Sequence, residues 1–177
     1  MDQAILKVAA QDVWAWAYAD FVPNAQRGVL AEYIVALAVG ATNSPRVMWD
    51  AVDVTSPKGL RIEVKSAAYL QAWQQTELSK IRFDIAPKRT WDPETSRYLS
   101  SPARTAAAYV FALFETTDRA LADPLDLEQW SFRVCGRADL ERTFGAQRTV
   151  ALAALEGMGL RRLRFGELQT ELRALGG

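Results

Sequence analysis

Leu60-Arg-Ile-Glu-Val-Lys65 alternates without a break between apolar and charged residues. This period of two predicts a β-strand with one buried face and one charged face. The preceding stretch, Val47-Met-Trp-Asp-Ala-Val-Asp-Val54, predicts a second strand, and Ser56-Pro-Lys-Gly59 supplies turn-forming residues between the two. The two strands are therefore expected to form a hairpin.

The rest of the chain is predicted to place helices before and after a run of strands. Further strands are expected at residues 81–85, 107–114 and 130–134, with an ordered loop over the sheet edge at 87–101. Apolar residues near a 3.6-residue period predict helices at 3–21, 25–39, 138–144, 149–156 and 166–175. This order implies an α/β or α+β fold, in which helices cover a sheet.

The composition fits one globular domain spanning residues 1–177 and excludes several kinds of active site. Because the chain has no histidine, it contains no Ser-His-Asp or Cys-His nucleophile system and no histidine-bearing zinc site. The single cysteine, Cys135, excludes an intrachain disulfide, and its neighbours favour a buried residue over a reactive thiol. Proton transfer must therefore depend on carboxylates, lysine, tyrosine or water.

Charge and hydropathy give weaker indications. The 21 basic and 21 acidic side chains cancel, which argues against non-specific coating of nucleic acid, although residues 54–106 are the more basic part. No stretch reaches the ~18 apolar residues that a membrane span needs, and the N-terminus lacks the basic region of a secretory signal. We therefore expect a cytoplasmic protein with no membrane partner.

Four charged residues could form a catalytic site: Glu32 in a predicted helix, Asp50 in the first strand of the hairpin, and Glu63 and Lys65 in the second. Carboxylates from neighbouring strands form the oxygen-rich site that Mg²⁺ or Mn²⁺ prefers, so Asp50 and Glu63 are the expected metal ligands. Lys65 lies on the same face of the strand as Glu63. A metal and a lysine together suit phosphodiester hydrolysis, because both can stabilise the charge that develops on the phosphate.

These residues resemble a known signature. Asp50, twelve intervening residues and then Glu63-Val-Lys65 resemble the motif of the PD-(D/E)XK nucleases, the restriction-endonuclease-like superfamily, with Glu32 in the place of its helical acid. The spacing is similar to that of Holliday-junction resolvases, and the longer context resembles a group of bacterial proteins that we place in the superfamily. Trp49 stands where the proline that begins the PD-(D/E)XK motif would be. Members of the superfamily often lack this proline. The resemblance covers about residues 24–90 and implies a mixed central β-sheet flanked by helices, with metal-dependent cleavage of nucleic acid, DNA in the first place.

The hairpin register leaves two candidates for the strand aspartate. A two-residue loop places Asp50 opposite Lys65, whereas a three-residue loop places Asp53 opposite Glu63. Simple alternation in the first strand favours Asp53, whereas the spacing of the family motif favours Asp50.

Substrate contacts are expected from polar residues near these motifs. The candidate nucleic-acid-binding residues are Arg27, Ser66, Gln71 and Gln75, which could hold a phosphate or the attacking water. The last three could equally solvate the start of a helix. Other basic side chains of the region could neutralise phosphates or remain solvated: Lys80, Arg82, Lys88 and Arg89.

Plainer interpretations stay open beside the nuclease. The chain could be a non-catalytic nucleic-acid- or protein-binding module that keeps the nuclease fold. The Glu-x-Lys pair could also be a surface ion pair of a protein-interaction domain. Apolar residues recur along residues 149–175 and predict either a homodimer contact or a helical layer on the chain's own sheet.

Overall fold

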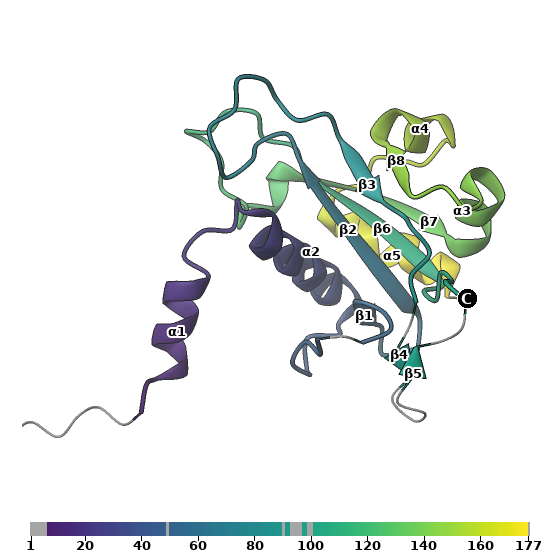
Figure 1. Cartoon of the computed structure of the whole chain (residues 1–177), viewed down its shortest axis with the longest axis horizontal. Helices are drawn as coiled ribbons and strands as arrows, with labels where there is room; N and C mark the ends of the chain where they lie inside the picture. Colours follow the sequence, from purple (N-terminus) through teal and green to yellow (C-terminus); the bar gives the residue numbers. More distant parts are fainter. Residues whose placement is uncertain (1–6, 49, 90, 93–96, 99–100, 177) are drawn as a thin grey trace, which may run out of the picture.

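A mixed four-stranded sheet forms the centre of the computed structural model, which describes residues 7–48, 50–89, 91–92, 97–98 and 101–176 (Figure 1). The strand order is β1-β2-β6-β7; β1 and β2 are antiparallel, β2 and β6 parallel, and β6 and β7 antiparallel. The strands are β1 (Val54–Thr55), β2 (Arg61–Ala68), β6 (Ala108–Phe114) and β7 (Trp130–Gly136). The predicted α/β class, with a mixed sheet packed against helices, is confirmed.

Two long helices cover one face of this sheet (Figure 1). They are α2 (Asn24–Val39) and α5 (Phe165–Leu175). Ile62 and Val64 of β2 lie on this face, in the same buried cluster as residues of both helices. All seven residues of β6 are buried, as expected for a strand that is covered on both faces.

Shorter elements cover the opposite face. Residues from these elements and from β2, β6 and β7 form a second buried cluster, which includes Phe83, Phe111 and Leu155. Cys135 belongs to it, and burial raises the pKa of its thiol to about 11, so the predicted buried cysteine is confirmed. The elements are β3 (Arg82–Asp84), α3 (Arg137–Phe144), β8 (Thr149–Ala151) and α4 (Leu152–Gly157), with β3 and β8 paired.

Most predicted elements are confirmed, but several differ in kind or extent. The strand predicted at 47–54 contributes only its last residue to β1. Before it, the backbone N–H of Ala51 donates to the side chain of Asp50, and the Ala51 carbonyl accepts from the side chain of Thr105, so neither group pairs with a neighbouring strand. The helix predicted at 149–156 begins only at Leu152, because the β-branched Thr149 and Val150 pair with β3. The rest of the described chain includes a 3₁₀ turn (Leu127–Gln129) and, within the loop predicted at 87–101, the paired strands β4 (Trp91–Asp92) and β5 (Arg97–Tyr98).

The first helix, α1 (Ala10–Ala17), extends away from the sheet (Figure 1). It is shorter than the predicted helix at 3–21, of which residues 3–6 lie outside the described residues. None of its side chains is buried, and Trp14 and Trp16 are exposed. Among the helices described, none combines the length and the apolar character needed to cross a membrane.

Most of the larger apolar residues of 149–175 pack on the chain's own sheet, whereas Leu175 is exposed. Leu163, Leu168 and Leu172 belong to the cluster under α2 and α5, and Leu155 belongs to the cluster on the opposite face. This burial supports the interpretation as a helical layer. A homodimer stays a prediction, but these buried leucines are not available as its contact surface.

Candidate active site

β2 places Glu63 and Lys65 on one face of the sheet, as their alternation predicts. Lys65 Nζ donates a hydrogen bond to Glu63 Oε1 at 2.6 Å. The side chains of Glu63 and Lys65 are only 10% and 12% exposed. Charges that lose so much hydration seldom gain net stability from their pairing. The pair is therefore not the solvated surface ion pair of the plainer interpretation.

The hairpin between β1 and β2 brings Asp53 next to Glu63. Val54 pairs with Ile62, so the preceding residue, Asp53, comes opposite Glu63. Asp53 Oδ2 accepts a hydrogen bond from the backbone N–H of Val64 at 2.7 Å, which fixes the carboxylate at the edge of β2. This is the register predicted for a three-residue loop.

Asp50 does not reach the paired part of the hairpin. It is exposed, and its Oδ1 accepts a hydrogen bond from the backbone N–H of Ala51 at 2.6 Å. The register that places Asp50 opposite Lys65 is not formed, because the loop holds three residues and ends in Gly59 at a φ of 85°. The register therefore selects Asp53, and not Asp50, as the neighbour of Glu63.

The two neighbouring carboxylates differ in how well their charge is compensated. Burial, together with the charge of Glu63, raises the pKa of Asp53 from 3.8 to about 6, although the Val64 N–H acts in the opposite direction. Burial also acts to raise the pKa of Glu63, but Lys65 and Lys88 outweigh it, so the pKa lies below its ordinary value. Asp53 is therefore the acid on which additional positive charge would have the larger effect.

Lys88 is a second lysine on the same carboxylate. Its Nζ donates to Glu63 Oε1 at 2.8 Å, the oxygen that also accepts from Lys65. The Lys88 side chain is 58% exposed, so its ammonium approaches Glu63 from the solvent side. The sequence alone does not distinguish Lys88 from the other basic side chains nearby, because its partner lies 25 residues away.

Residues 103–105 hold the surroundings of the site in place. Ala103 exchanges two backbone hydrogen bonds with Lys88, at 3.1 and 3.0 Å. The Thr105 hydroxyl donates to the carbonyl of Ala51 at 2.9 Å. Between them, the buried Arg104 donates to three backbone carbonyls at 2.5 to 3.0 Å. The segment thus fixes both the backbone of Lys88 and the approach to β1.

Tyr109 also lies next to Glu63, and the sequence alone does not indicate that the two residues are neighbours. Tyr109 lies on β6 directly across from Glu63. Burial and the charge of Glu63 raise the pKa of Tyr109 to about 12, so the phenol stays protonated. For Arg104 a signal exists in the sequence, since it is an arginine next to the apolar run of β6, but its backbone partners are distant along the chain.

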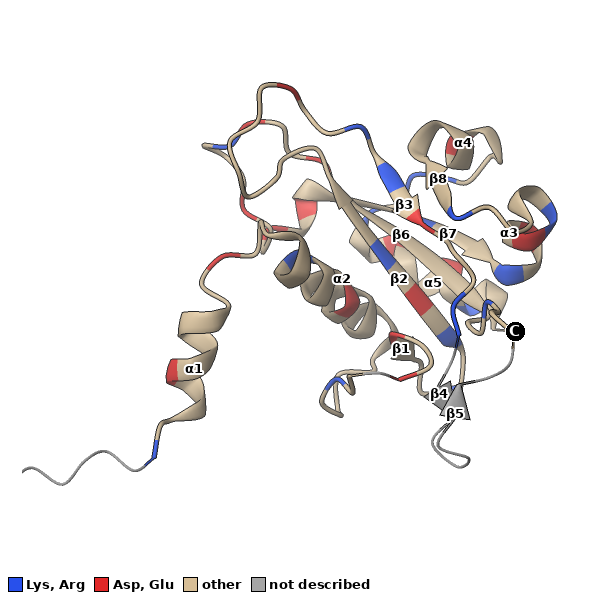
Figure 2. Cartoon of the chain, viewed as in Figure 1, with Lys and Arg blue, Asp and Glu red and all other residues tan. Residues whose placement is uncertain are grey.

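A cleft of about 790 Å³ opens between α2 and the segment that leads into β1. Glu32, Asp50 and Asp53 line it, while Glu63 and Lys65 do not. Glu32 forms a two-pronged ion pair with Arg46, whose Nη2 lies 3.0 Å from Glu32 Oε1. Figure 2 shows acidic residues on α2 and near β1, next to the charged bands of β2. Asp53 therefore connects the acids of the cleft with the Glu63–Lys65 pair.

The donor atoms of the site fit a divalent cation held by two protein ligands. Within the described residues, no group of three acidic or cysteine side chains could hold a metal ion. Asp53 and Glu63 nevertheless offer neighbouring carboxylates, and the raised pKa of Asp53 reflects its burial and then the charge of Glu63. Mg²⁺ commonly binds one or two carboxylates and completes its coordination with water and phosphate. Asp53 and Glu63 are therefore the residues that could hold Mg²⁺ or Mn²⁺, whereas the sequence predicts Asp50 and Glu63.

Two of the predicted nucleic-acid-binding residues have roles inside the fold. Arg27 is 3% exposed, and its guanidinium donates to the Val22 carbonyl and to Asn24 Oδ1, both at 2.6 Å. Burial lowers the pKa of Arg27 to about 10. Ser66 lies on the opposite face of β2 from Glu63, and its hydroxyl oxygen is buried. Neither side chain presents its polar group at the Glu63 site.

Gln71 and Gln75 close the loop that follows β2. The backbone N–H of Gln71 donates to Gln75 Oε1 at 2.6 Å, and both side chains donate to Ser79 Oγ at 3.1 Å. Gln75 also donates to the carbonyl of Tyr69 at 3.2 Å. These contacts explain both glutamines by the loop itself, which lies beyond the end of β2 and not beside Glu63.

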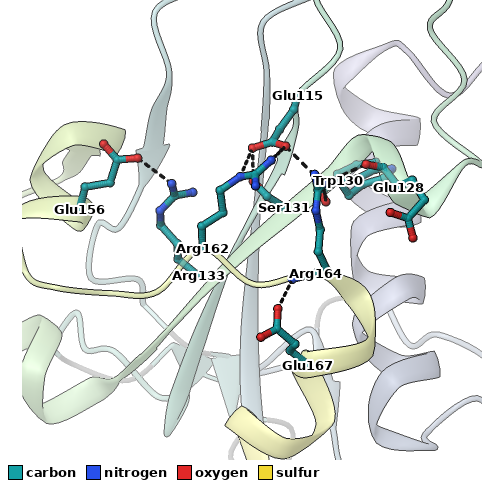
Figure 3. Close-up of polar contacts among 9 residues, drawn as sticks. All are labelled: Glu115, Glu128, Trp130, Ser131, Arg133, Glu156, Arg162, Arg164 and Glu167. Atoms are coloured by element: carbon teal, nitrogen blue, oxygen red, sulfur yellow. Dashed lines mark hydrogen bonds and ion pairs between the residues drawn. The ribbon is translucent and has the colours of Figure 1, made fainter.

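A second polar cluster joins the start of α5 to the end of β6 and the start of β7 (Figure 3). Glu115 accepts hydrogen bonds from Ser131 at 2.6 Å, from Arg162 and from Arg164 at 3.4 Å. Arg164 also donates to two backbone carbonyls within residues 128–130, at 2.9 and 2.8 Å. The cluster thus binds its own carboxylate and backbone together and has a structural role.

The candidate site combines two neighbouring carboxylates, a largely buried lysine and an adjoining cleft. No family model matches the chain, and no curated protein is significantly similar to it. The function must therefore be inferred from the chemistry of the site.

Proposed function

We propose that this protein is a divalent-metal-dependent nuclease of the PD-(D/E)XK type, with a restriction-endonuclease-like fold, that hydrolyses phosphodiester bonds of DNA. The observation that carries the proposal is the withdrawal of the Glu63–Lys65 pair from solvent with Asp53 beside it. Perturbed, partly buried ionisable groups of this kind concentrate at functional sites. Glu63 and Lys65 lie two residues apart on β2, which is the Glu-x-Lys spacing on which the proposed resemblance rests.

Asp53 and Glu63 are the proposed metal ligands. A bound Mg²⁺ or Mn²⁺ would supply Lewis-acid charge to a phosphoryl oxygen and make a water molecule more acidic. The role of Lys65 follows from its own position: its ammonium, 2.6 Å from Glu63 Oε1, can orient the attacking water and stabilise charge that develops on the phosphate. Glu32 and Asp50 line the adjoining cleft and would accept hydrogen bonds from water there.

A cleavage assay tests this function. The wild type would be incubated with labelled single-stranded, duplex and branched DNA, and with RNA, in Mg²⁺, Mn²⁺ or EDTA. We expect metal-dependent cleavage of at least one DNA substrate. Lys65→Ala, purified in the same way, is the matched control against a contaminating nuclease. Equal cleavage by the two proteins, or cleavage in EDTA, would contradict the proposal.

A non-catalytic binding module is the second candidate. It is favoured by the two ammonium groups on Glu63 Oε1 and by the lack of a three-acid metal group among the described residues. On this alternative the protein binds nucleic acid or another protein in EDTA as tightly as in Mn²⁺ and cleaves none of the substrates. The same panel, followed by fluorescence anisotropy, distinguishes the two functions.

A further inference from the structure

Two lysine ammonium groups, one on a largely buried side chain and one on an exposed side chain, bind the same oxygen of Glu63. Lys65 Nζ and Lys88 Nζ lie 2.6 and 2.8 Å from Glu63 Oε1. Lys65 extends from the same strand as Glu63 and is 12% exposed, whereas Lys88 extends from the segment after β3 and is 58% exposed. Burial acts to lower the pKa of Lys88, but Glu63 outweighs it and raises the pKa, so the ammonium stays charged.

The backbone beneath Lys88 is held in place, so its side chain can move alone. The two backbone hydrogen bonds with Ala103 fix the position of the Lys88 main chain. The long, flexible stem of lysine lets the ammonium change partners. Lys65, in contrast, is packed against the sheet. Lys88 can therefore leave Glu63 without disturbing the strands.

We propose that Lys88 is a displaceable cation, which occupies Glu63 in the metal-free protein and moves to a phosphate of the nucleic acid when a divalent metal binds. The inference rests on the proposed nuclease function. Lys65 and Lys88 already share one oxygen of Glu63, so a metal ion there adds a third positive charge and weakens the hold on Lys88. A substrate phosphate is then the strongest new acceptor for the freed ammonium.

This exchange couples the two ligands of the protein. Metal binding releases Lys88 for the nucleic acid, and nucleic acid that holds Lys88 leaves Glu63 open to the metal. Each ligand must then raise the affinity of the other by the same factor. Metal binding in the absence of nucleic acid is correspondingly weak, because the metal must compete with a cation that is already in place.

Mn²⁺ titration followed by electron paramagnetic resonance, without nucleic acid, tests the first half of the exchange. Lys88→Gln removes the competing charge, and we expect its Mn²⁺ affinity to exceed that of the wild type by roughly fivefold or more, the lower end of typical coupling between ligands. Lys88→Arg keeps the charge and is expected to bind as weakly as the wild type. Lys58→Gln, at an exposed hairpin lysine, is the control for net charge and should bind like the wild type.

Duplex binding in Mn²⁺ tests the second half. In a Lys65→Ala background, which prevents cleavage on the proposed function, adding Lys88→Gln should weaken binding of a fluorescent duplex by roughly fivefold. Adding Lys58→Gln should not weaken it. Circular dichroism verifies that each variant is folded, as the exposure of Lys88 and Lys58 leads us to expect.

Three outcomes would overturn the inference. Unchanged Mn²⁺ affinity in Lys88→Gln, while the wild type binds Mn²⁺ and cleaves, would refute the displacement and leave the nuclease function standing. Tighter Mn²⁺ binding with no loss of duplex affinity would refute the transfer of Lys88 to phosphate. An absence of Mn²⁺ binding in every variant would overturn both the inference and the proposed function.

Discussion

The carboxylate of Asp53 accepts the backbone N–H of Val64 at 2.7 Å, a donor that points out of β2 on the side of β1. Since N–H groups alternate in direction along a strand, Val64 points the same way as Ile62, which pairs with Val54. β1 begins only at Val54, so a side chain takes the place of the missing strand residue. An acid is thereby held at the sheet edge beside Glu63.

Replacing the two candidate aspartates separately should show which one acts. We expect Asp53→Asn to lower the cleavage rate by about 100-fold or more, since it removes a charged ligand beside Glu63. Asp50→Asn should retain most activity, because Asp50 is exposed and, among the described residues, accepts a hydrogen bond only from the backbone of its neighbour Ala51. Steady-state rates on the preferred DNA substrate measure both effects. The reverse ranking would contradict the assignment from the register.

Asp53→Asn should also stabilise the metal-free protein at neutral pH. The pKa of Asp53 is raised from 3.8 to about 6, so the folded state binds its proton more tightly than the unfolded chain does. The carboxylate therefore costs stability progressively as the pH rises from about 4 to about 6, and its full cost applies above that range. Allowing for partial exposure to solvent, asparagine should add about 1 to 2 kcal/mol at pH 7.5.

Urea denaturation in EDTA measures this pH dependence. The difference between Asp53→Asn and the wild type should shrink towards zero near pH 4, because the wild-type carboxyl is then mostly protonated in the folded state and nearly half protonated in the unfolded state. A gain that is independent of pH would contradict the explanation by charge.

Lys65→Ala should strongly lower the cleavage rate without weakening Mn²⁺ binding, because it removes one of the two cations on Glu63 Oε1. The lysine is proposed to act on water and on the developing charge, and losing such a group typically costs about 100-fold to 1,000-fold in rate. Glu63 keeps Lys88 as a partner, so the fold should survive with a small loss of stability. Cleavage rate, Mn²⁺ affinity and thermal unfolding are the measurements, with Lys58→Ala as the control.

Glu63→Gln should lose Mn²⁺ binding and cleavage together and should also destabilise the fold. Lys65 and Lys88 would keep their charges without the carboxylate that compensates them. Breaking a largely buried pair on one side typically costs about 3 to 5 kcal/mol, and the exposure of Lys88 should reduce this to about 2 kcal/mol. Urea denaturation checks the stability. A variant as stable as the wild type would show that the ion pair is better solvated than its burial indicates.

Leu168→Ala should destabilise the monomer and not dissociate a dimer. Leu168 is fully buried between α5 and the sheet, and such truncations cost about 2 to 5 kcal/mol. Light scattering at micromolar concentration should give the same mass for the variant and the wild type. A lower mass in the variant would show that this leucine contributes to an interface between two copies.

The sequence predicts the fold wherever the pattern is local. The alternation in residues 60–65 and the apolar run of 107–114 correspond to β2 and β6. Thr149–Ala151 could not be separated from the helix that follows, because strand formation there depends on pairing with β3. The partial loss of the strand at 47–54 likewise depends on a contact with Thr105, 54 residues away from its partner.

In the candidate site, too, some features follow from a local sequence pattern and others depend on tertiary structure. The shared face of Glu63 and Lys65 follows from alternation alone, and it is confirmed. The choice between Asp50 and Asp53 depends on a single residue of loop length, which the turn-forming residues of 56–59 leave open. The partnership of Lys88 with Glu63 needs tertiary structure, since no local pattern links the two.

Residues 103–105, which fix the backbone of Lys88 and the approach to β1, follow the charged residues of the site in the sequence. This order determines when the site can form during synthesis. The contacts of Thr105 and Arg104 span 54 and 41 residues of sequence, and such distant pairings slow folding because a long loop must close first. During synthesis, every charged residue of the proposed site leaves the ribosome before residues 103–105 and β6 do. A nascent chain that ends before Ala103 therefore carries the complete motif but lacks the contacts that would arrange it, so a premature stop there would leave the motif without its proposed activity.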